Sequence, residues 1–331
     1  MKAILIRAQG GRENLRLEEI EKPSPDSGEI LVKVKACSLN YLDIFVRRGM
    51  PGLPVDLPRI GGGDIAGEIE EIGLGVNNLS LGDRILIDPA IQLPDGQIGA
   101  LGENANGGLT EYITISAENA IPLPDAVSFE DAAALPIAYG TAWRMLHTRG
   151  QLKTGESIFI LGASGGVGTA AIQIAKSVGC VVYAGSGSDE KLKRLESLGA
   201  DYGVNTSKNE EFHRTIRGMT NGEGVDVVVN YTGGETWVRA LKTLKHGGRL
   251  LTCGATIGFD PPTDIRYIWR KEMNILGSDG WRRSDLVDLI NAVSNGQIIP
   301  IIDKILPLNE TAEGHRLLEE REVFGKVIIK P

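Results

Sequence analysis

The sequence predicts an α/β protein of two domains: a mainly antiparallel β domain and a doubly wound parallel sheet with helices on both faces. Three observations carry this prediction. Short strand patterns separated by turn residues fill about the first 120 residues, and strand and helix patterns alternate from residue 157 to residue 278. The length of 331 residues also suits two domains of about 100 to 200 residues each.

The strands expected in the first domain are short segments of alternating apolar and polar residues bounded by turns. They are MKAILIRA (1–8), EILVKVKAC (29–37), DIAGEIEEIG (64–73), DRILI (83–87) and TEYITI (110–115). The segment 88–107 shows no periodicity, which a compact domain rarely tolerates unless the segment has a function. We expect a surface lobe there, and the alternative is a mobile insertion without function.

The second half begins with helical patterns at 129–135 and 141–149 and continues as a βα series. Its strands are SIFILG (157–162), CVVYAG (180–185), DYGVN (201–205), VDVVVN (225–230), GRLLTCG (248–254) and MNILGS (273–278). Helical segments such as GTAAIQIAKSV (168–178) and DEKLKRLESLG (189–199) separate the strands, as in a parallel sheet covered on both faces. Because the series is complete at 278, the later helices (284–294, 310–320) and strands (304–306, 326–330) are expected to rejoin the first domain.

Composition excludes several classes of partner. The chain carries 35 Lys and Arg against 43 Asp and Glu, a formal charge of -8, so we expect neither a nucleic-acid nor a membrane partner. Its three cysteines, Cys37, Cys180 and Cys253, form no disulfide framework or metal-binding pair. The N-terminus lacks the features of a signal peptide, and no apolar stretch approaches about 18 residues. A cytoplasmic protein is the simplest expectation.

A glycine-rich turn follows the first strand of the parallel series. Glycines there permit a tight turn and let backbone N–H groups approach a pyrophosphate at the helix N-terminus. A purely structural turn is the alternative, but the strand before it and the helix after it favour nucleotide binding. The residues expected to bind the cofactor are Gly162, Ala163, Ser164, Gly165, Gly166, Val167 and Gly168.

The end of the second parallel strand indicates which dinucleotide binds. An acidic residue about 20 residues beyond the glycine motif would bind the ribose 2′-hydroxyl of NAD, but residues 183–188 read Tyr-Ala-Gly-Ser-Gly-Ser. Ser186 and Ser188 can donate hydrogen bonds to a 2′-phosphate, and Lys191 can supply charge, so NADP(H) is favoured. Ser188 can also be a helix N-cap, and Lys191 can be a solvated surface residue.

Several motifs, spread over the whole chain, occur together. They are KAILI (2–6), GEILVKV (28–34), SLNYLD (38–43), GGDIAG (62–67), GDR (82–84), GGLTEY (107–112), LP (135–136), TAW (141–143), GASGGVG (162–168) and GKV (325–327). In these motifs the sequence resembles the medium-chain dehydrogenase/reductase superfamily, and its zinc-free quinone oxidoreductase branch in particular. The resemblance implies a GroES-like catalytic domain from residues 1–123 and 279–331, a Rossmann domain at 124–278, and an active site in the cleft between them.

The sequence departs from the zinc-dependent members of this superfamily. The position of a zinc-binding cysteine carries Asn40, and the Gly-His-Glu triplet reads Gly62-Gly63-Asp64. The segment 88–107 lies where relatives carry a four-cysteine structural zinc site, yet it contains no cysteine. We therefore expect no bound metal.

The resemblance places Asn40, Tyr41 and Asp43 as candidate catalytic residues. Asn40 can hold a carboxamide, a ribose hydroxyl or a substrate oxygen, or it can stabilise a local turn. Tyr41 can donate a proton to a reduced acceptor or pack in the core. Asp43 can instead be a structural carboxylate paired with Arg47 or Arg48.

The branch often places tyrosines shortly after this motif, whereas this sequence has Phe45 and Met50. These residues and Leu53 can line an acceptor site or belong to the core. Three further candidate cofactor contacts are Thr141, which can also be a helix-start hydroxyl, Gly254, which follows the fifth parallel strand, and Lys326, which can also be a solvated lysine.

The function that the resemblance implies is hydride transfer from NADPH to a quinone without zinc. The alternatives are an NADPH-dependent reductase of α,β-unsaturated carbonyls or enoyl thioesters, a non-catalytic NADPH-binding protein, and an alcohol dehydrogenase-like enzyme. A small-molecule hydride acceptor is the expected partner, and a homodimer or homotetramer is the expected assembly.

Overall fold

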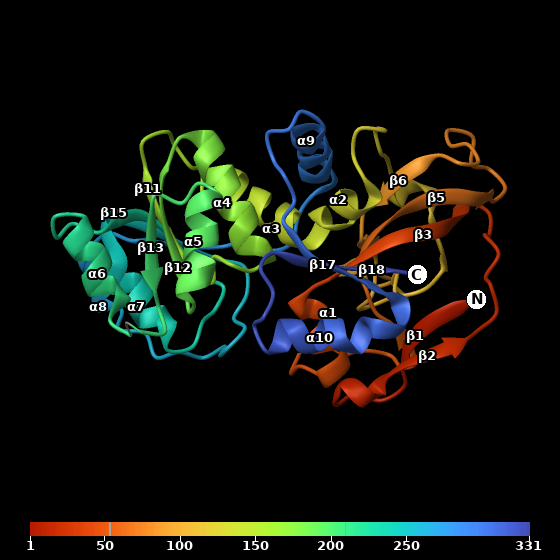
Figure 1. The fold of residues 1–331 in the computed structure, drawn as a ribbon, viewed down its shortest axis with the longest axis horizontal. Coiled ribbons are helices and arrows are strands. Elements are labelled where there is room, and N and C mark those ends of the chain that lie inside the picture. The colour runs from red at the N-terminus through yellow and green to blue at the C-terminus, as the bar shows by residue number, and fades with distance from the viewer. Residues whose placement is uncertain (53, 209) are drawn as a thin grey trace. The chain divides into compact units, whose positions relative to one another are not determined.

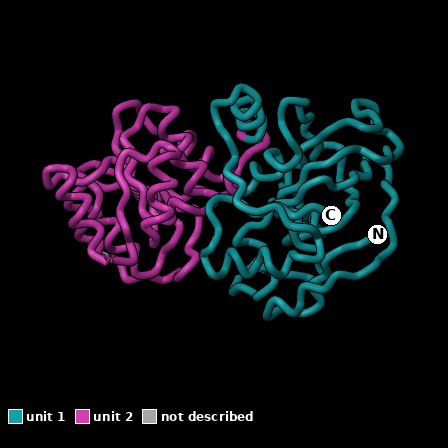
Figure 2. The backbone as a smooth tube through the Cα atoms, viewed as in Figure 1, with its two compact units in different colours: residues 1–137, 286–331 teal, residues 138–285 magenta. Residues whose placement is uncertain are grey.

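The computed structural model describes residues 1–52, 54–208 and 210–331, and these form two compact units (Figures 1 and 2). Unit 1 comprises 1–137 and 286–331, and unit 2 comprises 138–285. Unit 1 extends beyond the predicted boundary at residue 123 because a short helix, α2 (Phe129–Ala133), packs on three strands of its main sheet. The chain returns to unit 1 after residue 285, not after residue 278 as predicted, because the segment that follows the last parallel strand stays with unit 2.

Unit 1 consists mainly of antiparallel strands. Its strands are β1 (Lys2–Ile6), β2 (Leu15–Glu19), β3 (Glu29–Leu39), β4 (Arg59–Ile60), β5 (Asp64–Ile72), β6 (Arg84–Ile87), β7 (Ala90–Gln92), β8 (Ile98–Ala100), β9 (Tyr112–Ser116), β10 (Ala120–Pro122), β17 (Ile302–Pro307) and β18 (Lys326–Lys330). Its helices, besides α2, are η1 (Arg12–Asn14), α1 (Tyr41–Arg48), η2 (Ala117–Asn119), η5 (Leu308–Glu310) and α10 (Thr311–Glu319). The π-helical turn η3 (Leu135–Gly140) and helix α9 (Arg283–Ser294) contain the points where the chain passes between the units.

The main sheet of unit 1 has the strand order β10-β6-β5-β3-β18-β17, and β9 also pairs with β3. The last strands therefore rejoin the N-terminal part, as predicted, because β18 is antiparallel to β3. One pair departs from the antiparallel pattern, since β17 and β18 run parallel. Alternate residues of β3, such as Ile30, Val32 and Val34, are buried in one apolar core.

Unit 2 is a six-stranded parallel sheet with the order β13-β12-β11-β14-β15-β16. The strands are β11 (Ser157–Ile160), β12 (Val181–Ser186), β13 (Tyr202–Asn205), β14 (Val225–Val229), β15 (Leu244–Thr252) and β16 (Asn274–Gly277). The helices are α3 (Thr141–Trp143), the π-helical η4 (Arg144–Arg149), α4 (Gly166–Val178), α5 (Asp189–Ser197), α6 (Phe212–Met219), α7 (Thr236–Thr243) and α8 (Arg266–Arg270). This order is the Rossmann order 3-2-1-4-5-6, so the strand order reverses between β11 and β14. The predicted fold class is confirmed.

The segment 88–107 forms a small lobe instead of an irregular insertion. Its strands β7 and β8 pair as an antiparallel hairpin, and Leu101 at its base is buried in the core of unit 1. None of the described helices is both long and apolar enough to cross a bilayer.

Candidate functional site

Strand register gathers three polar residues at one end of the main sheet of unit 1. Ser38 pairs with Asp64 at the start of β5, and Leu39 pairs with Val327 near the start of β18. Asn40 follows β3 directly, and Lys326 is the first residue of β18. Neighbouring strands therefore bring Asn40, Asp64 and Lys326 together, although 286 residues separate Asn40 from Lys326.

Lys326 is a buried ammonium with three acceptors. Its side chain is 2% exposed, and Nζ donates to the Leu39 carbonyl at 3.0 Å, Asn40 Oδ1 at 2.5 Å and Asp64 Oδ2 at 3.2 Å. A lysine ammonium has three N–H donors, so protein oxygens match all of them. The solvated lysine considered from the sequence is therefore wrong.

The amide of Asn40 is held from both ends. Its Oδ1 accepts from Lys326, and its Nδ2 donates to Asp64 Oδ2 at 2.8 Å and to the Ser38 carbonyl at 3.4 Å. The residue is 8% exposed and immediately precedes helix α1. Nδ2 therefore makes one short hydrogen bond, to Asp64, and one long hydrogen bond, to the Ser38 carbonyl.

Asp43 caps the start of α1 and ties it to the turn before β5. Its Oδ2 accepts from the backbone N–H of Asn40 at 2.7 Å, and its Oδ1 accepts from that of Gly62 at 2.8 Å. The pairing with Arg47 or Arg48 that the sequence left open is not observed, because both arginines bind Glu319 on α10. Burial raises the pKa of Asp43 to about 6.

Asp64 was identified in the sequence only as a departure from a zinc motif, and not as a site residue. It is fully buried, and its Oδ1 accepts from the backbone N–H of Ile137 at 2.8 Å. Burial raises the pKa of Asp64, and the charge of Lys326 opposes that rise. The signal available in the sequence was an acidic residue at the start of a strand that otherwise reads as buried.

Tyr41 lies next to this cluster in sequence, but its hydroxyl has another partner. The hydroxyl donates to the Leu318 carbonyl on α10 at 3.1 Å, and the ring lies 6.2 Å from that of Phe45. This contact supports an anchoring role for Tyr41. Of the apolar wall candidates, Phe45 and Met50 are half-buried, and Leu53 lies outside the described residues.

The base of the lobe packs directly on the turn that carries the Gly62 amide. A Cβ atom at Gly107 would lie 2.2 Å from the Gly62 oxygen, so a side chain there would push the two segments apart. Gly108 donates its backbone N–H to the same oxygen at 2.7 Å. The lobe thus supports the turn that holds Asp43.

These residues do not fit a zinc site. A lysine ammonium already lies within hydrogen-bond distance of both Asn40 and Asp64, and it would repel a second cation there. Asparagine is also outside the usual set of zinc ligands. Throughout 1–52, 54–208 and 210–331, no group of three His, Cys, Asp or Glu side chains is placed to hold a metal ion.

In unit 2 the glycine loop has the geometry expected of a phosphate-binding turn. Gly162 has a φ of 66°, which favours glycine, and a Cβ atom at Gly168 would lie 2.5 Å from the Ala163 backbone. Gly165, the N-cap of α4, has no side chain that could cap this helix N-terminus. A Cβ atom at Gly165 would meet only the Gly162 oxygen, at 3.6 Å, which leaves room for a pyrophosphate. The loop therefore fits a dinucleotide, with the half-buried Ser164 and Val167 beside it.

Tyr231 contacts this loop and was not predicted. It follows β14, and its hydroxyl donates to the Gly162 carbonyl after β11 at 2.7 Å. The two strands flank the position where the strand order reverses, which is where ligands bind in doubly wound sheets. No pattern in the sequence indicated this contact, because a tyrosine after a buried strand is equally typical of core packing.

The three residues expected at the 2′-phosphate lie at the end of β12 and the start of α5. Ser186 is buried, and Ser188 caps α5 by accepting from the backbone N–H of Lys191 at 3.4 Å. The acidic Asp189 next to them binds Lys208 and Asn205, each at 2.5 Å. Its charge is therefore balanced by Lys208.

Two other predicted cofactor contacts belong to unit 2. Thr141 is the buried first residue of α3, and Gly254 is exposed just beyond β15. The polar cluster of unit 1 and the glycine loop of unit 2 are thus each assembled within one unit, and the predicted residues divide between them.

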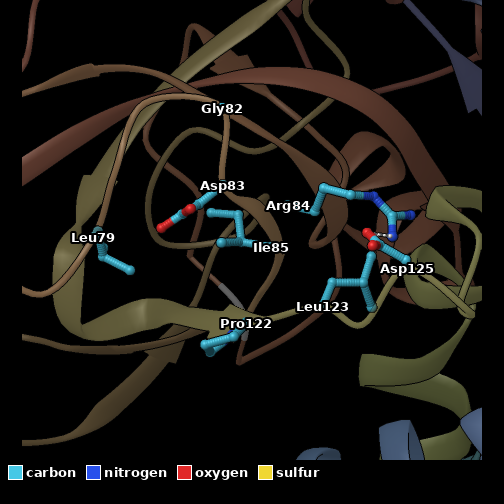
Figure 3. Close-up of a pocket in the computed structure, with 8 residues that line it drawn as sticks. All are labelled: Leu79, Gly82, Asp83, Arg84, Ile85, Pro122, Leu123 and Asp125. Atoms are coloured by element: carbon cyan, nitrogen blue, oxygen red, sulfur yellow. Dashed lines mark hydrogen bonds and ion pairs between the residues drawn. The ribbon is translucent and has the colours of Figure 1, made fainter.

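A pocket of about 380 Å³ in unit 1 lies elsewhere (Figure 3). Residues from β6, β10 and their flanking loops line it, among them Arg84, Pro122 and Asp125. It contains none of the residues of the polar cluster, and Arg84 pairs with Asp125 at 3.4 Å. We assign it no part in the chemistry.

Sequence comparisons show which class of protein carries these two sites. Residues 26–125 match the alcohol dehydrogenase GroES-like domain family, and residues 166–295 match the zinc-binding dehydrogenase family. A zinc-type alcohol dehydrogenase-like protein of Schizosaccharomyces pombe is 33% identical, with 97% of this chain and 96% of that protein covered. A quinone oxidoreductase of Rattus norvegicus is 31% identical, with 99% and 97% covered.

An acryloyl-coenzyme A reductase of Sulfurisphaera tokodaii is 29% identical, with both chains fully covered. Among solved structures, an NAD-dependent alcohol dehydrogenase has a TM-score of 0.93 and 36% identity, with both chains fully covered. Fold and sequence together define an oxidoreductase of the dehydrogenase type. The chain belongs to the medium-chain dehydrogenase/reductase superfamily, whose oxidoreductases use nicotinamide cofactors.

Proposed function

We propose that this protein is a zinc-free oxidoreductase that transfers hydride from NADPH to a quinone. The observation that carries the proposal is the buried cluster of Asn40, Asp64 and Lys326, which holds the amide of Asn40 in one orientation. The described residues contain no set of side chains placed to bind a metal ion. An acceptor that is already electrophilic needs no Lewis acid to react with hydride. The similarity to quinone oxidoreductases over almost the whole chain supports the same acceptor class.

The choice of NADPH rests on the end of β12. Ser186 and Ser188 leave room for a 2′-phosphate, and Lys191 stands one turn into α5. Two acidic side chains, Asp189 and Glu190, stand in the first turn of α5, and the charge of Asp189 is balanced by Lys208, so that it repels a phosphate less. An acidic residue at the end of β12 itself would favour NAD instead, and residues 183–188 contain none.

The bound nicotinamide would supply the hydride. The residues of the chain would bind the cofactor, orient the acceptor and stabilise the negative charge that develops on it. The glycine loop would bind the pyrophosphate through backbone N–H groups. Asn40 would donate from Nδ2 to the acceptor oxygen, where negative charge develops as the acceptor gains hydride. The reduced quinone then takes one proton from water to become the hydroquinone.

A second candidate acceptor is an activated carbon–carbon double bond, in an enone or an enoyl thioester. The full-length similarity to an acryloyl-coenzyme A reductase favours it. The same oriented amide would serve here, because hydride addition to an enone also leaves an oxyanion. An alcohol dehydrogenase-like reaction is less well supported, since the cluster does not fit a zinc ion.

The test is steady-state oxidation of NADPH and of NADH, without added metal, with a benzoquinone, a naphthoquinone, an enone and a short enoyl-CoA. We expect quinone turnover with a strong preference for NADPH. The variant Asn40→Ala should lower kcat by about 100-fold. Asn77→Ala, at an exposed amide that donates to the Gly75 carbonyl, is the matched control.

Turnover with only the enone or the thioester would favour the second acceptor class. Tight NADPH binding without turnover on any acceptor would contradict both and would indicate a non-catalytic NADPH-binding protein. A preference for NADH would overturn the interpretation of the β12 segment.

Assembly and cellular setting belong to the same proposal. We infer a homo-oligomer formed along β16, an edge strand with Ile275 37% exposed, since an unpaired strand edge favours pairing with a second copy. The three free cysteines suit a reducing, cytoplasmic setting.

A further inference from the structure

The orientation of the Asn40 amide follows from the chemistry of its two neighbours. An ammonium can only donate, so the atom 2.5 Å from Lys326 Nζ must be the amide oxygen. An ionised carboxylate can only accept, so the atom 2.8 Å from Asp64 Oδ2 must be the amide nitrogen. Each neighbour alone excludes the flipped amide, so two independent contacts give the same orientation.

We propose that Lys326 and Asp64 act as a positioning pair that presents the N–H of Asn40, and not its C=O, to the oxygen of the hydride acceptor. This inference rests on the proposed function, because it assigns how that site stabilises the developing oxyanion. Lys326 thereby has a role different from the cofactor contact expected from the sequence, since its three donors already bind protein oxygens.

The ammonium does more than fix the orientation. Its bond to Oδ1 draws electron density from the amide nitrogen, which makes each Nδ2 hydrogen a stronger donor in a buried site. One of these hydrogens binds Asp64 at 2.8 Å. The other has only the 3.4 Å contact to the Ser38 carbonyl, so it is the one available to a ligand oxygen.

The pairing of the two charges also limits the free-energy cost of burying them. Lys326 is 2% exposed and Asp64 is fully buried, so neither charge is stabilised by water. Removing one partner would leave the other charge buried and unpaired, which destabilises a protein strongly. A test must therefore separate loss of folding from loss of orientation.

The experiment compares Lys326→Met with the double variant Lys326→Met/Asp64→Asn. The single variant leaves an uncompensated carboxylate and should lower the melting temperature. The double variant removes both charges, so most of the melting temperature should return, but the amide of Asn40 is no longer fixed. Lys330→Met is the matched control, because Lys330 ends the same strand, is 51% exposed and binds Glu130.

For the double variant we expect kcat with the preferred acceptor to remain about 10- to 100-fold below the unaltered enzyme, with the NADPH Kd within about threefold. Lys326→Arg should restore part of kcat, since it keeps a donor for Oδ1. Recovery of kcat together with stability would overturn the proposal and leave the pair a purely structural role. A loss confined to the NADPH Kd would show that Lys326 binds the cofactor instead.

A second readout needs no turnover. The side-chain Nδ2 resonances of Asn40, assigned by their absence from the Asn40→Ser spectrum, should exchange with solvent at least about tenfold faster in the double variant. If no acceptor turns over but this exchange changes as expected, the proposed function fails while the positioning pair stands. Unchanged exchange would overturn the positioning pair whatever the enzyme reduces.

Discussion

Two buried side chains of unit 1 respond to pH in opposite directions. Burial raises the pKa of Asp43 from 3.8 to about 6. Burial, with the charges of Arg47, Arg12 and Arg48, lowers the pKa of His315 on α10 from 6.5 to about 3. Between pH 4 and 6 the native state thus holds a proton on Asp43 that the unfolded state releases, and lacks one on His315 that the unfolded state binds.

The contributions of these two groups to the pH dependence of stability should nearly cancel in the wild-type protein. Substitution of either group should reveal the contribution of the other. Asp43 lowers the free energy of unfolding by about 1.4 kcal/mol per pH unit as pH rises through this range, and His315 raises it by a similar amount. Relative to wild type, His315→Leu should therefore lose stability as pH rises from 4 to 6, and Asp43→Asn should gain it. Urea unfolding at several pH values measures both slopes.

Curves for the two variants that run parallel to the wild-type curve would contradict this pH prediction. His315→Leu should also raise stability near pH 5, because both ring nitrogens of His315 are buried without a hydrogen-bond partner among the described residues. His246→Gln, at an exposed histidine, controls for the loss of an imidazole.

Residue by residue, the sequence identified chemistry better than it identified partners. Asn40 and Lys326 were chosen by resemblance, and the structure joins them. Asp64 was missed as a site residue because its partner Lys326 lies 262 residues away, and pairings at that distance leave no periodic pattern. For Asp43 the sequence offered only Arg47 or Arg48 as possible partners, because nearby arginines are visible in a sequence, whereas the Gly62 amide that it binds is not.

At the scale of elements, the geometry of the glycine loop and α4 predicts how a substitution at Gly165 affects NADPH binding. Gly165 has an extended backbone conformation open to any residue, and a Cβ atom there would come no closer than 3.6 Å to other protein atoms. Gly165→Ala should therefore leave the melting temperature unchanged but raise the NADPH Kd about tenfold or more, because the methyl group would occupy space needed by the pyrophosphate. Fluorescence titration measures the Kd.

A matched substitution controls for the glycine loop. Gly218→Ala, in α6, also adds a methyl group where no atom lies within 4 Å, and it should leave NADPH binding unchanged. Equal binding by wild type and Gly165→Ala would mean that the pyrophosphate does not pass this position.

The hydroxyl of Tyr231, in the loop after β14, should affect the affinity of the same site for NADPH. Tyr231→Phe removes the hydrogen bond to the Gly162 carbonyl and leaves the ring in place. A net loss of about 0.5 to 1.5 kcal/mol corresponds to a roughly twofold to twelvefold rise in the NADPH Kd. A lower melting temperature with an unchanged Kd would show that the hydroxyl serves the fold alone.

Elements with strong local patterns were predicted well, and elements defined by long-range contacts were not. The six parallel strands and α4 follow from β-branched runs, glycines and an apolar helix face. Helix α1 was not recognised because its residues were interpreted only as a motif. The hairpin of the lobe escaped detection because β7 and β8 have three residues each, too few to show alternation.

At the scale of the whole molecule, the oligomer that we propose depends on the free edge of the unit 2 sheet. If β16 pairs with a second copy, Ile275→Lys should separate the oligomer, because a lysine on an edge strand opposes pairing. Light scattering after gel filtration gives the mass. Tyr202→Lys, on the opposite edge strand β13, is the control and should keep the oligomer intact; a monomeric wild type would refute the assembly.

The two-domain organisation was predictable because the pattern of the chain changes after residue 123. Its limits were not, since the assignment of α2 depends on which sheet the helix packs against. Likewise, the parallel pairing of β17 and β18 could not be predicted, because the residues of a strand do not indicate the direction of the neighbouring strand.

The position of β18 has a consequence for how the chain folds as it is synthesised. Unit 2 is one continuous segment, so the ribosome releases all of it before the end of unit 1 exists. The N-terminal strands must then wait with an open place beside β3, which β18 fills only when Lys326 and its neighbours emerge. The ammonium that completes the polar cluster is thus translated after the whole of unit 2, and we expect the glycine loop of a nascent chain to form before this cluster is complete.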